Sequence, residues 1–134
     1  MSKSRERILI ADDSPIVRSF HSNILKSAGF RVDTAIDGSE ALEKVLSNDY
    51  SLILCDINMP NMDGITFLKR YREEGKETPV IVITTQEEAI HKKRCYDAGA
   101  NLYLVKPIKP SSLVLHIKIL LGRGDTGGTE ARWG

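Results

Sequence analysis

The sequence predicts an α/β fold built on a parallel sheet, and three observations support it. Short apolar segments of strand length alternate with segments whose apolar residues recur at helical spacing, and the alternation repeats five times. Strands that alternate with helices form a parallel sheet through right-handed crossovers. Most of the expected strands are apolar throughout, which indicates that helices cover both faces of the sheet. We therefore expect a (βα)5 domain of the doubly wound type.

The first half of the chain contains three expected strands, at residues 8–11, 30–35 and 51–55. The first helix is expected to begin after Ser14, a favourable N-cap residue that precedes a proline, and to end at Gly29. The apolar residues at helical spacing in this segment include Ile16 and Phe20. We expect His21, in the same helix, to lie at the surface or to be half-buried. A second helix is expected to end near residue 48.

The second half contains two further strands, expected at residues 80–83 and 102–105. A third helix is expected between Gly64 and Gly75, a fourth over about residues 87–98, and a fifth from Pro110 onward. We expect residues 1–6 to be an N-terminal extension and residues 7–121 to be the folded domain. Residues 122–134 are rich in glycine and are expected to form a flexible tail.

The composition excludes several classes of protein. The formal net charge of +1 gives no reason to expect direct binding to nucleic acid or to an anionic membrane. No segment has the ~20 consecutive apolar residues of a membrane span, and the first residues lack the apolar core of a signal peptide. Cys55 and Cys95 fit neither a disulfide framework nor a paired metal motif. We expect a cytoplasmic protein that does not insert into membranes.

Polar side chains follow four of the five expected strands. Asp12 and Asp13 follow the first strand, Asp56 follows the third, Thr84 ends the fourth and Lys106 follows the fifth. In a parallel sheet the carboxyl ends of all strands meet at one edge, which is where open α/β sheets bind ligands. Three carboxylates, a hydroxyl and an ammonium group should therefore converge at this edge.

This group of side chains indicates a metal site. Two carboxylates ~4 Å apart repel each other by about 4 kcal/mol at an effective dielectric constant near 20, and one lysine does not balance three acids. Oxygen ligands without histidine or cysteine favour Mg²⁺, or Mn²⁺, over zinc. The backbone carbonyl of Asn58, two residues after Asp56, can add a further oxygen. A carboxylate beside a cation, a lysine and a hydroxyl is suited to accept a phosphoryl group.

With these residues in these places, the sequence resembles the receiver domains of two-component response regulators, and in particular the CheY-like, single-domain members. The resemblance extends from about residue 7 to residue 121 and rests on Asp12-Asp13, Asp56, Asn58-Met59-Pro60, Met62-Asp63-Gly64, Thr84 and Lys106-Pro107. It implies a flavodoxin-like sheet of strand order 2-1-3-4-5. It also implies a cis peptide bond between Lys106 and Pro107.

The resemblance assigns a role to each residue of the expected site. Asp56 would accept a phosphoryl group from the phosphohistidine of a sensor histidine kinase. Mg²⁺ would be held by Asp13, Asp56 and the backbone carbonyl of Asn58, with Asp12 contributing through a water molecule. Lys106 would pair with the acids and then with the phosphoryl group. The protein would be a signalling switch rather than an enzyme, with only self-phosphotransfer and autodephosphorylation.

The resemblance also implies how the signal leaves the site. Thr84 would move toward the phosphoryl group and Tyr103 would fill the space it vacates. This movement would reshape the face made by the fourth helix, the fifth strand and the fifth helix, where a target protein would dock. Asn58 and Gln86 would flank the path of an attacking water molecule and so tune the phosphoryl lifetime. We also hypothesise that Thr85 narrows access to the phosphoryl group.

Several alternatives stay open at this point. An aspartate-based phosphohydrolase usually has a second acid two residues after its nucleophile, where this sequence has Asn58. A protein-interaction module that signals without phosphate is a further alternative. A nucleotide-binding fold is disfavoured because residues 11–14 are not rich in glycine. Within two-component signalling, both chemotaxis and a phosphorelay are compatible with the motifs. The chain can be a stand-alone receiver or one excised from a larger regulator, and a monomer or a weak dimer that depends on phosphorylation.

Overall fold

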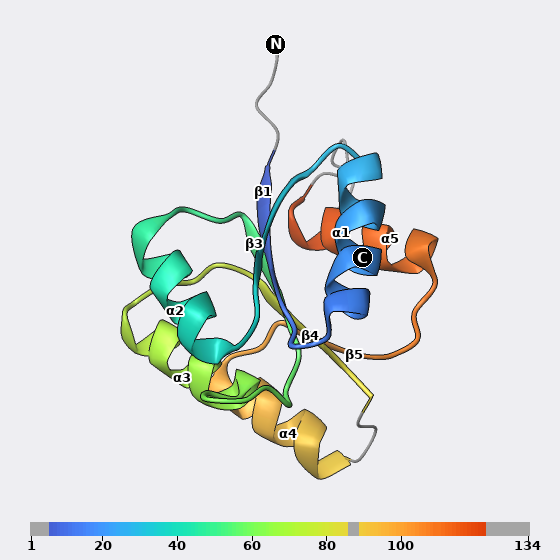
Figure 1. Cartoon of the computed structure of the whole chain (residues 1–134). Coiled ribbons are helices and arrows are strands. Elements are labelled where there is room, and N and C mark those ends of the chain that lie inside the picture. The colour runs from blue at the N-terminus through green and yellow to red at the C-terminus, as the bar shows by residue number, and fades with distance from the viewer. Residues whose placement is uncertain (1–5, 86–88, 123–134) are drawn as a thin grey trace.

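A five-stranded parallel sheet forms the centre of the computed structural model, which describes residues 6–85 and 89–122 (Figure 1). The strands are β1 (Arg7–Ala11), β2 (Arg31–Ala35), β3 (Leu52–Cys55), β4 (Val80–Thr84) and β5 (Leu102–Val105). They lie in the order β2-β1-β3-β4-β5, and every neighbouring pair is parallel. The expected flavodoxin-like order is therefore confirmed.

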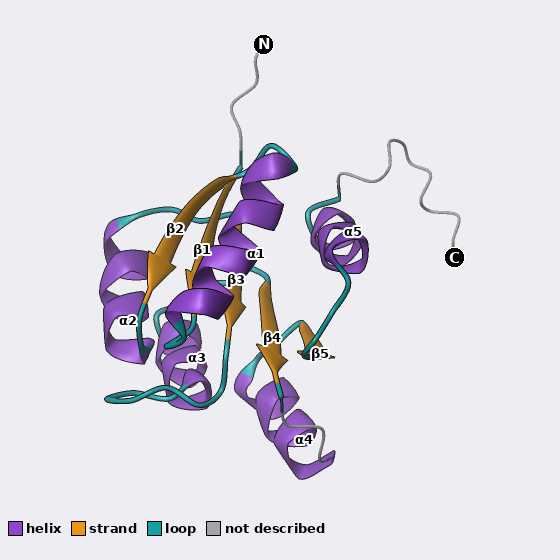
Figure 2. Cartoon of the chain, turned by 45° about the vertical axis from the view of Figure 1, so that its right-hand side comes forward, coloured by secondary structure: helices purple, strands orange, loops and turns teal. Residues whose placement is uncertain are grey.

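Five helices cover the two faces of the sheet within the described residues. They are α1 (Pro15–Ser27), α2 (Gly38–Ser47), α3 (Gly64–Glu73), α4 (Ala89–Ala98) and α5 (Pro110–Leu120). α1 and α5 lie on one side of the sheet, and α2, α3 and α4 lie on the other (Figures 1 and 2). None of these helices has the length and hydropathy that a transmembrane segment requires.

The side chains of each strand alternate between two apolar clusters, one on each side of the sheet. On β1, Ile8 and Ile10 pack in the cluster that contains Leu25 of α1 and Leu113 of α5. Leu9, between them, packs in the cluster shared with α2, α3 and α4. This alternation explains why the central strands are apolar throughout, because both of their faces are covered.

Three helices begin at residues whose side chains cap them. Ser14 Oγ accepts the backbone N–H of Val17 at 3.2 Å, and one carboxylate oxygen of Asp37 accepts that of Glu40 at 2.8 Å. Asp63 Oδ1 likewise accepts the backbone N–H of the residue three positions later, at 2.8 Å. Each cap satisfies an N–H group that has no partner within the helix. The caps fix the starts of α1, α2 and α3 at the carboxyl edge of the sheet.

The buried face of α1 differs from the one expected. His21 is 4% exposed, whereas Ile16 and Phe20 are 81% and 51% exposed. The expectation that His21 lies at the surface or is half-buried is therefore wrong. His21 and Leu25, which are four residues apart, form one stripe on the helix and turn toward the sheet. α1 thus buries a polar side chain at its middle and leaves two large apolar side chains of its first half exposed.

The ends of the expected domain stay predictions. Of the expected N-terminal extension, only Glu6 lies among the described residues, and of the expected tail, only Gly122 does. The helix boundaries agree with the sequence to within a few residues, and the start expected for the fourth helix lies outside the described residues. The fold thus places the carboxyl ends of β1, β3, β4 and β5 at one edge, where the candidate site lies.

Candidate functional site

Three carboxylates meet at the carboxyl edge of the sheet. One oxygen from each of Asp12, Asp13 and Asp56 lies within 4.8 Å of the others. Asp12 and Asp56 are buried and Asp13 is exposed. Pairing of β1 with β3 fixes this arrangement, since the Asp56 N–H donates to the carbonyl of Ala11 at 3.0 Å. The convergence expected from the sequence is confirmed for these three acids.

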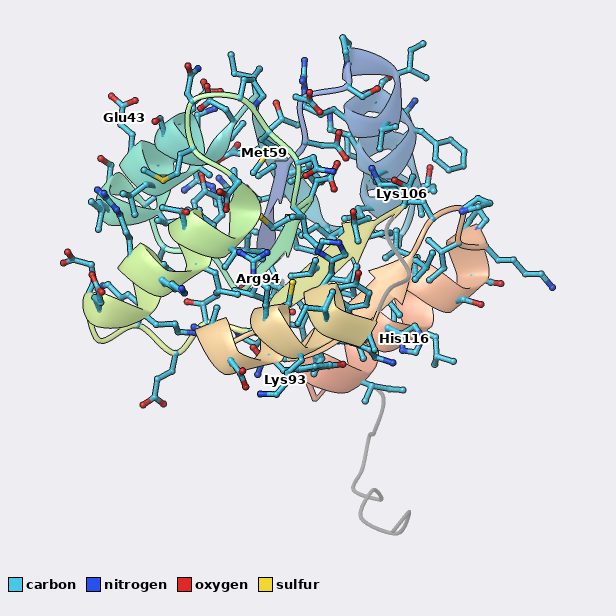
Figure 3. The ribbon with its side chains drawn as sticks, turned by 90° about the horizontal axis from the view of Figure 1, so that it is seen from below. Glu43, Met59, Lys93, Arg94, Lys106 and His116 are labelled. Atoms are coloured by element: carbon cyan, nitrogen blue, oxygen red, sulfur yellow. The ribbon has the colours of Figure 1, made fainter. Side chains whose placement is uncertain are left out.

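Lys106 supplies positive charge to the same edge. Its Nζ lies 2.8 Å from Asp12 Oδ2 and 3.3 Å from Asp56 Oδ2. The backbone N–H of Lys106 also donates to the carbonyl of Thr84 at 2.7 Å. The peptide bond between Lys106 and Pro107 is cis, as the resemblance implied. Figure 3 looks onto this edge and shows Lys106 next to α1. Although burial favours the neutral amine, the two carboxylates raise the pKa of Lys106, so the ammonium form persists.

The Asp56 carboxylate is held in a fixed orientation by contacts at both of its oxygens. Its Oδ1 accepts the backbone N–H of Ile57 at 2.7 Å, while Oδ2 faces the ammonium of Lys106. Burial raises the pKa of Asp56; Lys106 opposes this rise, and Asp12 adds to it. The carboxylate form is thus held at some energetic cost in a partly desolvated site, as is typical of functional carboxylates.

Gly64 allows α3 to approach the backbone of Asp56. A Cβ atom at position 64 would lie 2.0 Å from the carbonyl oxygen of Asp56, a distance that atoms do not adopt. The Gly64 N–H donates to the carbonyl of Ile57 at 2.8 Å, and Cys55 Sγ donates to the Asp56 carbonyl at 3.2 Å. The sequence placed Gly64 at the start of the third helix, but the close approach to Asp56 is visible only in three dimensions.

Thr84 and Tyr103 lie on the same face of the sheet, the one that α4 covers. Tyr103 pairs in register with Val82, and Thr84 is two residues further along β4. Both side chains are buried. Among the described residues, the Thr84 hydroxyl has no hydrogen-bond partner, although it lies near enough to Asp56 to oppose the rise in that pKa. The Tyr103 N–H donates to the hydroxyl of Tyr96 on α4 at 3.1 Å, which joins β5 to α4.

The remaining predicted site residues are placed less fully. Asn58 is exposed in the loop between β3 and α3, and Thr85 is exposed after β4. Gln86 lies outside the described residues. The sequence did not predict that His21 belongs to the surroundings of the site. Burial lowers the pKa of His21, and nearby Lys106 lowers it further. In the sequence, only the four-residue spacing from Leu25 could have indicated that His21 is buried.

The donor set fits a hard divalent cation. The ligand atoms are carboxylate oxygens from three residues, and the group contains no histidine or cysteine. Such a set selects Mg²⁺ or Mn²⁺ over zinc. The exposure of Asp13 leaves one side of the group open to solvent, which suits Mg²⁺ because that ion retains several water ligands.

The surface of α4 and α5 combines charged and apolar side chains. Figure 3 shows Lys93 on α4 and His116 on α5 on adjoining surfaces. Lys93 forms an ion pair with Asp97 at 2.8 Å. Because both side chains are exposed, this ion pair contributes little to stability. Among the large apolar side chains exposed here are Ile90 and Ile119. The sequence did not predict that these apolar side chains are exposed.

The sequence matches the model of the response regulator receiver domain family over residues 8–118. Among curated proteins, it is 38% identical over 123 residues to the transcriptional regulatory protein SrrA of Staphylococcus aureus. That match covers 92% of this chain and 51% of the relative. The chain therefore spans about half the length of the curated relatives it matches.

Solved structures give the same result. The chemotaxis protein CheY4 of Vibrio cholerae is 35% identical with a TM-score of 0.83, over 87% of this chain and 99% of that one. The receiver domain of the sensor histidine kinase PA1611 of Pseudomonas aeruginosa is 30% identical with a TM-score of 0.82. That match covers 89% of this chain and 99% of the other, whose structure has a magnesium ion coordinated in its active-site cleft.

Proposed function

Because the chain belongs to the response regulator receiver domain family, we propose that it is a phosphorylation-activated switch whose phosphoacceptor is Asp56. The observation that carries this proposal is the proximity of Asp56 both to two other carboxylates and to Lys106. The carboxylate lies within 4.8 Å of two further acids and 3.3 Å from the ammonium of Lys106. Such a site can hold a cation and neutralise a phosphoryl group at the same place.

The proposed reaction transfers a phosphoryl group from the phosphohistidine of a sensor histidine kinase. An oxygen of Asp56 attacks phosphorus, an O–P bond forms, and the N–P bond to the imidazole breaks. The imidazole leaves with the electron pair and takes up a proton. The backbone N–H of Ile57 holds one Asp56 oxygen in place, and Lys106 faces the other, where it neutralises the oxygens of the incoming group.

The metal would be Mg²⁺, with Mn²⁺ as a substitute. Asp13, Asp56 and the backbone carbonyl of Asn58 would hold it, and Asp12 would contribute through a water molecule. When bound, the cation would supply positive charge that offsets the carboxylates and the oxygens of the phosphoryl group. The proposal is supported by the oxygen-only donor set and by the raised pKa of Asp56, which burial causes.

The proposed switch couples Thr84 to Tyr103. A phosphoryl oxygen gives the Thr84 hydroxyl an acceptor that it does not have among the described residues, and its movement makes room for the ring of Tyr103. This two-state change would alter the α4–β5–α5 face and so bind a target protein. Asn58 and Gln86 would set the phosphoryl lifetime, and Thr85 would narrow access to the site. If Thr85→Ala leaves the rates of phosphorylation and dephosphorylation unchanged, the role of Thr85 is rejected.

The proposed partners are a sensor histidine kinase and a protein target that docks on the α4–β5–α5 face. We expect the domain to work in the cytoplasm, without direct binding to nucleic acid or insertion into membranes. Its own chemistry would be limited to phosphotransfer and autodephosphorylation. A role in chemotaxis and a role in a phosphorelay both fit, as do a stand-alone receiver and a receiver of a longer regulator. Its state would be a monomer or a weak dimer that depends on phosphorylation.

The proposal is tested with small donors that replace the kinase. The wild type and Asp56→Asn are incubated with acetyl phosphate or phosphoramidate, with and without Mg²⁺, and the intact mass is measured. Phosphoramidate has the P–N bond that a phosphohistidine has. We expect one phosphoryl group on the wild type, only with Mg²⁺, and none on the variant. The absence of any gain would favour an interaction module, and rapid turnover of generic phosphate esters would favour a phosphohydrolase.

A further inference from the structure

The loop between β3 and α3, residues 56–63, is bonded to the start of α2 as well as to the site. It carries Asn58, and it runs beneath the start of α2 (Figure 1). At its beginning, the loop is fixed by the bond from the Gly64 N–H to the carbonyl of Ile57, 2.8 Å long, and by the buried side chain of Met59. Its far part extends away from the sheet (Figure 2), and there it needs another contact to hold its shape.

Asp37 and Asn61 provide that contact. Asn61 Nδ2 donates to Asp37 Oδ2 at 2.6 Å, and the Gly38 N–H donates to the carbonyl of Met62 at 2.9 Å. Asp37 is buried, and its other oxygen caps α2 through the N–H of Glu40. The bond from Asn61 and the cap together lower the pKa of Asp37, so its carboxylate keeps both hydrogen bonds at neutral pH.

The backbone at this contact has little freedom. Asn61 adopts the left-handed conformation with φ of 66°, which asparagine tolerates better than most residues. A Cβ atom at Gly38 would lie 2.4 Å from the carbonyl oxygen of Met62, so the two loops approach as closely as backbones can. The β2–α2 connection is itself tied to the site, because the Asp12 N–H donates to the carbonyl of Ala35 at 3.1 Å.

A path of covalent and hydrogen bonds therefore links Asp12 to Asp56 by way of the two loops. It runs from Asp12 through the end of β2 to Asp37, across to Asn61, and back along the loop to Asn58 and Asp56. We propose that Asp37 and Asn61 are positioning residues that hold the β3–α3 loop in the shape in which the carbonyl of Asn58 can reach the metal. This inference rests on the proposed function, because it requires that Mg²⁺ binds at the carboxylates.

The test measures Mg²⁺ affinity directly, by calorimetric titration without any phosphoryl donor. Asn61→Gly removes the amide and leaves the backbone unstrained, because glycine adopts positive φ freely. Asn61→Asp keeps the shape of the side chain but places two carboxylates together. We expect both to weaken Mg²⁺ binding by about three- to tenfold, somewhat less than the effect of residues that bond directly to metal ligands.

Two further variants separate positioning from general effects. Asn48→Gly removes a similar amide bond, from Asn48 Nδ2 to the carbonyl of Lys44 at 3.0 Å, at the opposite end of α2. It should leave Mg²⁺ affinity unchanged. The exchange Asp37→Asn with Asn61→Asp keeps the net charge, the α2 cap and the cross-loop bond with its donor and acceptor reversed. It should restore Mg²⁺ affinity to within about twofold of the wild type, a smaller change than the loss expected when a residue that supports a metal ligand is removed.

Each outcome decides one question. Weaker Mg²⁺ binding in Asn61→Asp is informative, because the added negative charge alone would strengthen Mg²⁺ binding. The inference is overturned if Asn61→Asp binds Mg²⁺ more tightly than the wild type. It is also overturned if Asn61→Gly binds Mg²⁺ as the wild type does. Failure of the exchanged pair to restore binding also overturns it. Unfolding in Mg²⁺-free buffer checks that all variants fold. A folded wild type that binds no Mg²⁺ contradicts the proposed function itself, whereas a binding wild type with unaffected variants contradicts only the role of Asp37 and Asn61.

Discussion

The ammonium of Lys106 lies 3.3 Å from Asp56 Oδ2, although 50 residues separate the two along the chain. The same ammonium lies 2.8 Å from Asp12. The contact depends on the sheet order, because β5 and β3 flank β4 and bring Lys106 and Asp56 to the same edge. Lys106 therefore partly offsets the charge of Asp12 and Asp56 before any phosphoryl group or cation binds, and it competes with a cation for these two carboxylates.

Replacing Lys106 by methionine should separate these two roles. The rate of phosphorylation by acetyl phosphate at saturating Mg²⁺ should fall by about a hundredfold, the typical effect of losing one group that stabilises a transition state. Mg²⁺ affinity should not fall, because the competing ammonium is gone. Lys109→Met, which changes an exposed lysine after β5, is the matched control. Equal phosphorylation rates for Lys106→Met and this control would show that Lys106 does not contribute to phosphoryl transfer.

Asp13→Asn should abolish stabilisation by Mg²⁺ without unfolding the protein, because Asp13 is exposed. A ligand that binds only the folded state stabilises it by about 2.7 kcal/mol at one hundred times its dissociation constant. At that concentration of Mg²⁺, the free energy of unfolding of the wild type should rise by this amount, and that of the variant should change little. Asp49→Asn makes the same charge change between α2 and β3, at the other edge of the sheet, and should respond like the wild type. A full response in Asp13→Asn would exclude Asp13 as a ligand.

Asp56→Asn should raise stability at neutral pH in Mg²⁺-free buffer, by about 1 kcal/mol as a typical single-site effect. Burial raises the pKa of Asp56 above its ordinary value of 3.8. The stability that this group contributes is present in full below the unfolded-state pKa and is lost as pH rises through the folded-state pKa. The gain in the variant should therefore grow with pH across that range and vanish in acid. A gain that does not depend on pH would contradict this explanation.

Thr84→Ala should uncouple the site from Tyr103. Thr84 and Tyr103 share the sheet face that α4 covers, and both are buried. In protein labelled with fluorotyrosine, with Tyr103→Phe used to assign the signal, phosphorylation should shift the fluorine resonance of Tyr103. Thr84→Ala should still accept the phosphoryl group but reduce this shift, whereas Thr84→Ser should retain it. An unchanged shift in Thr84→Ala would reject the coupling.

Gly64→Ala should destabilise the protein by about 3 kcal/mol, at the upper end of overpacking effects, because the added Cβ would meet the backbone carbonyl of Asp56. Gly75→Ala is an informative comparison. Its Cβ meets nothing within 4 Å, but its φ of 81° makes alanine strained, at about 1 kcal/mol. Denaturant unfolding measures both. Equal losses at the two positions would mean that the close approach at Gly64 contributes nothing beyond backbone strain.

The sequence predicted those features that follow from local patterns. The apolar alternation located the strands, and residues such as Ser14 and Gly29 marked the ends of α1. The acids, Thr84 and Lys106 could be assigned to one edge because parallel strands all end there. The order of the strands came from the resemblance to receiver domains and not from periodicity.

The features that were missed depend on tertiary contacts. The buried position of His21 reflects how α1 rotates against the sheet, which the spacing of its apolar residues does not determine. The bond between Asp37 and Asn61 joins two turns that are 24 residues apart, and each residue by itself is an ordinary turn residue. The approach of Gly64 to Asp56 likewise depends on how α3 follows β3.

The most direct test of the central claim identifies the residue that carries the phosphoryl group. The wild type is treated with acetyl phosphate and Mg²⁺, reduced with borohydride, which converts an aspartyl phosphate to homoserine, and mapped by peptide mass spectrometry. We predict homoserine at position 56 and unchanged aspartate at positions 12 and 13. Homoserine at either of those positions, or a phosphoryl group retained on another side chain while Asp56 is intact, would contradict the account.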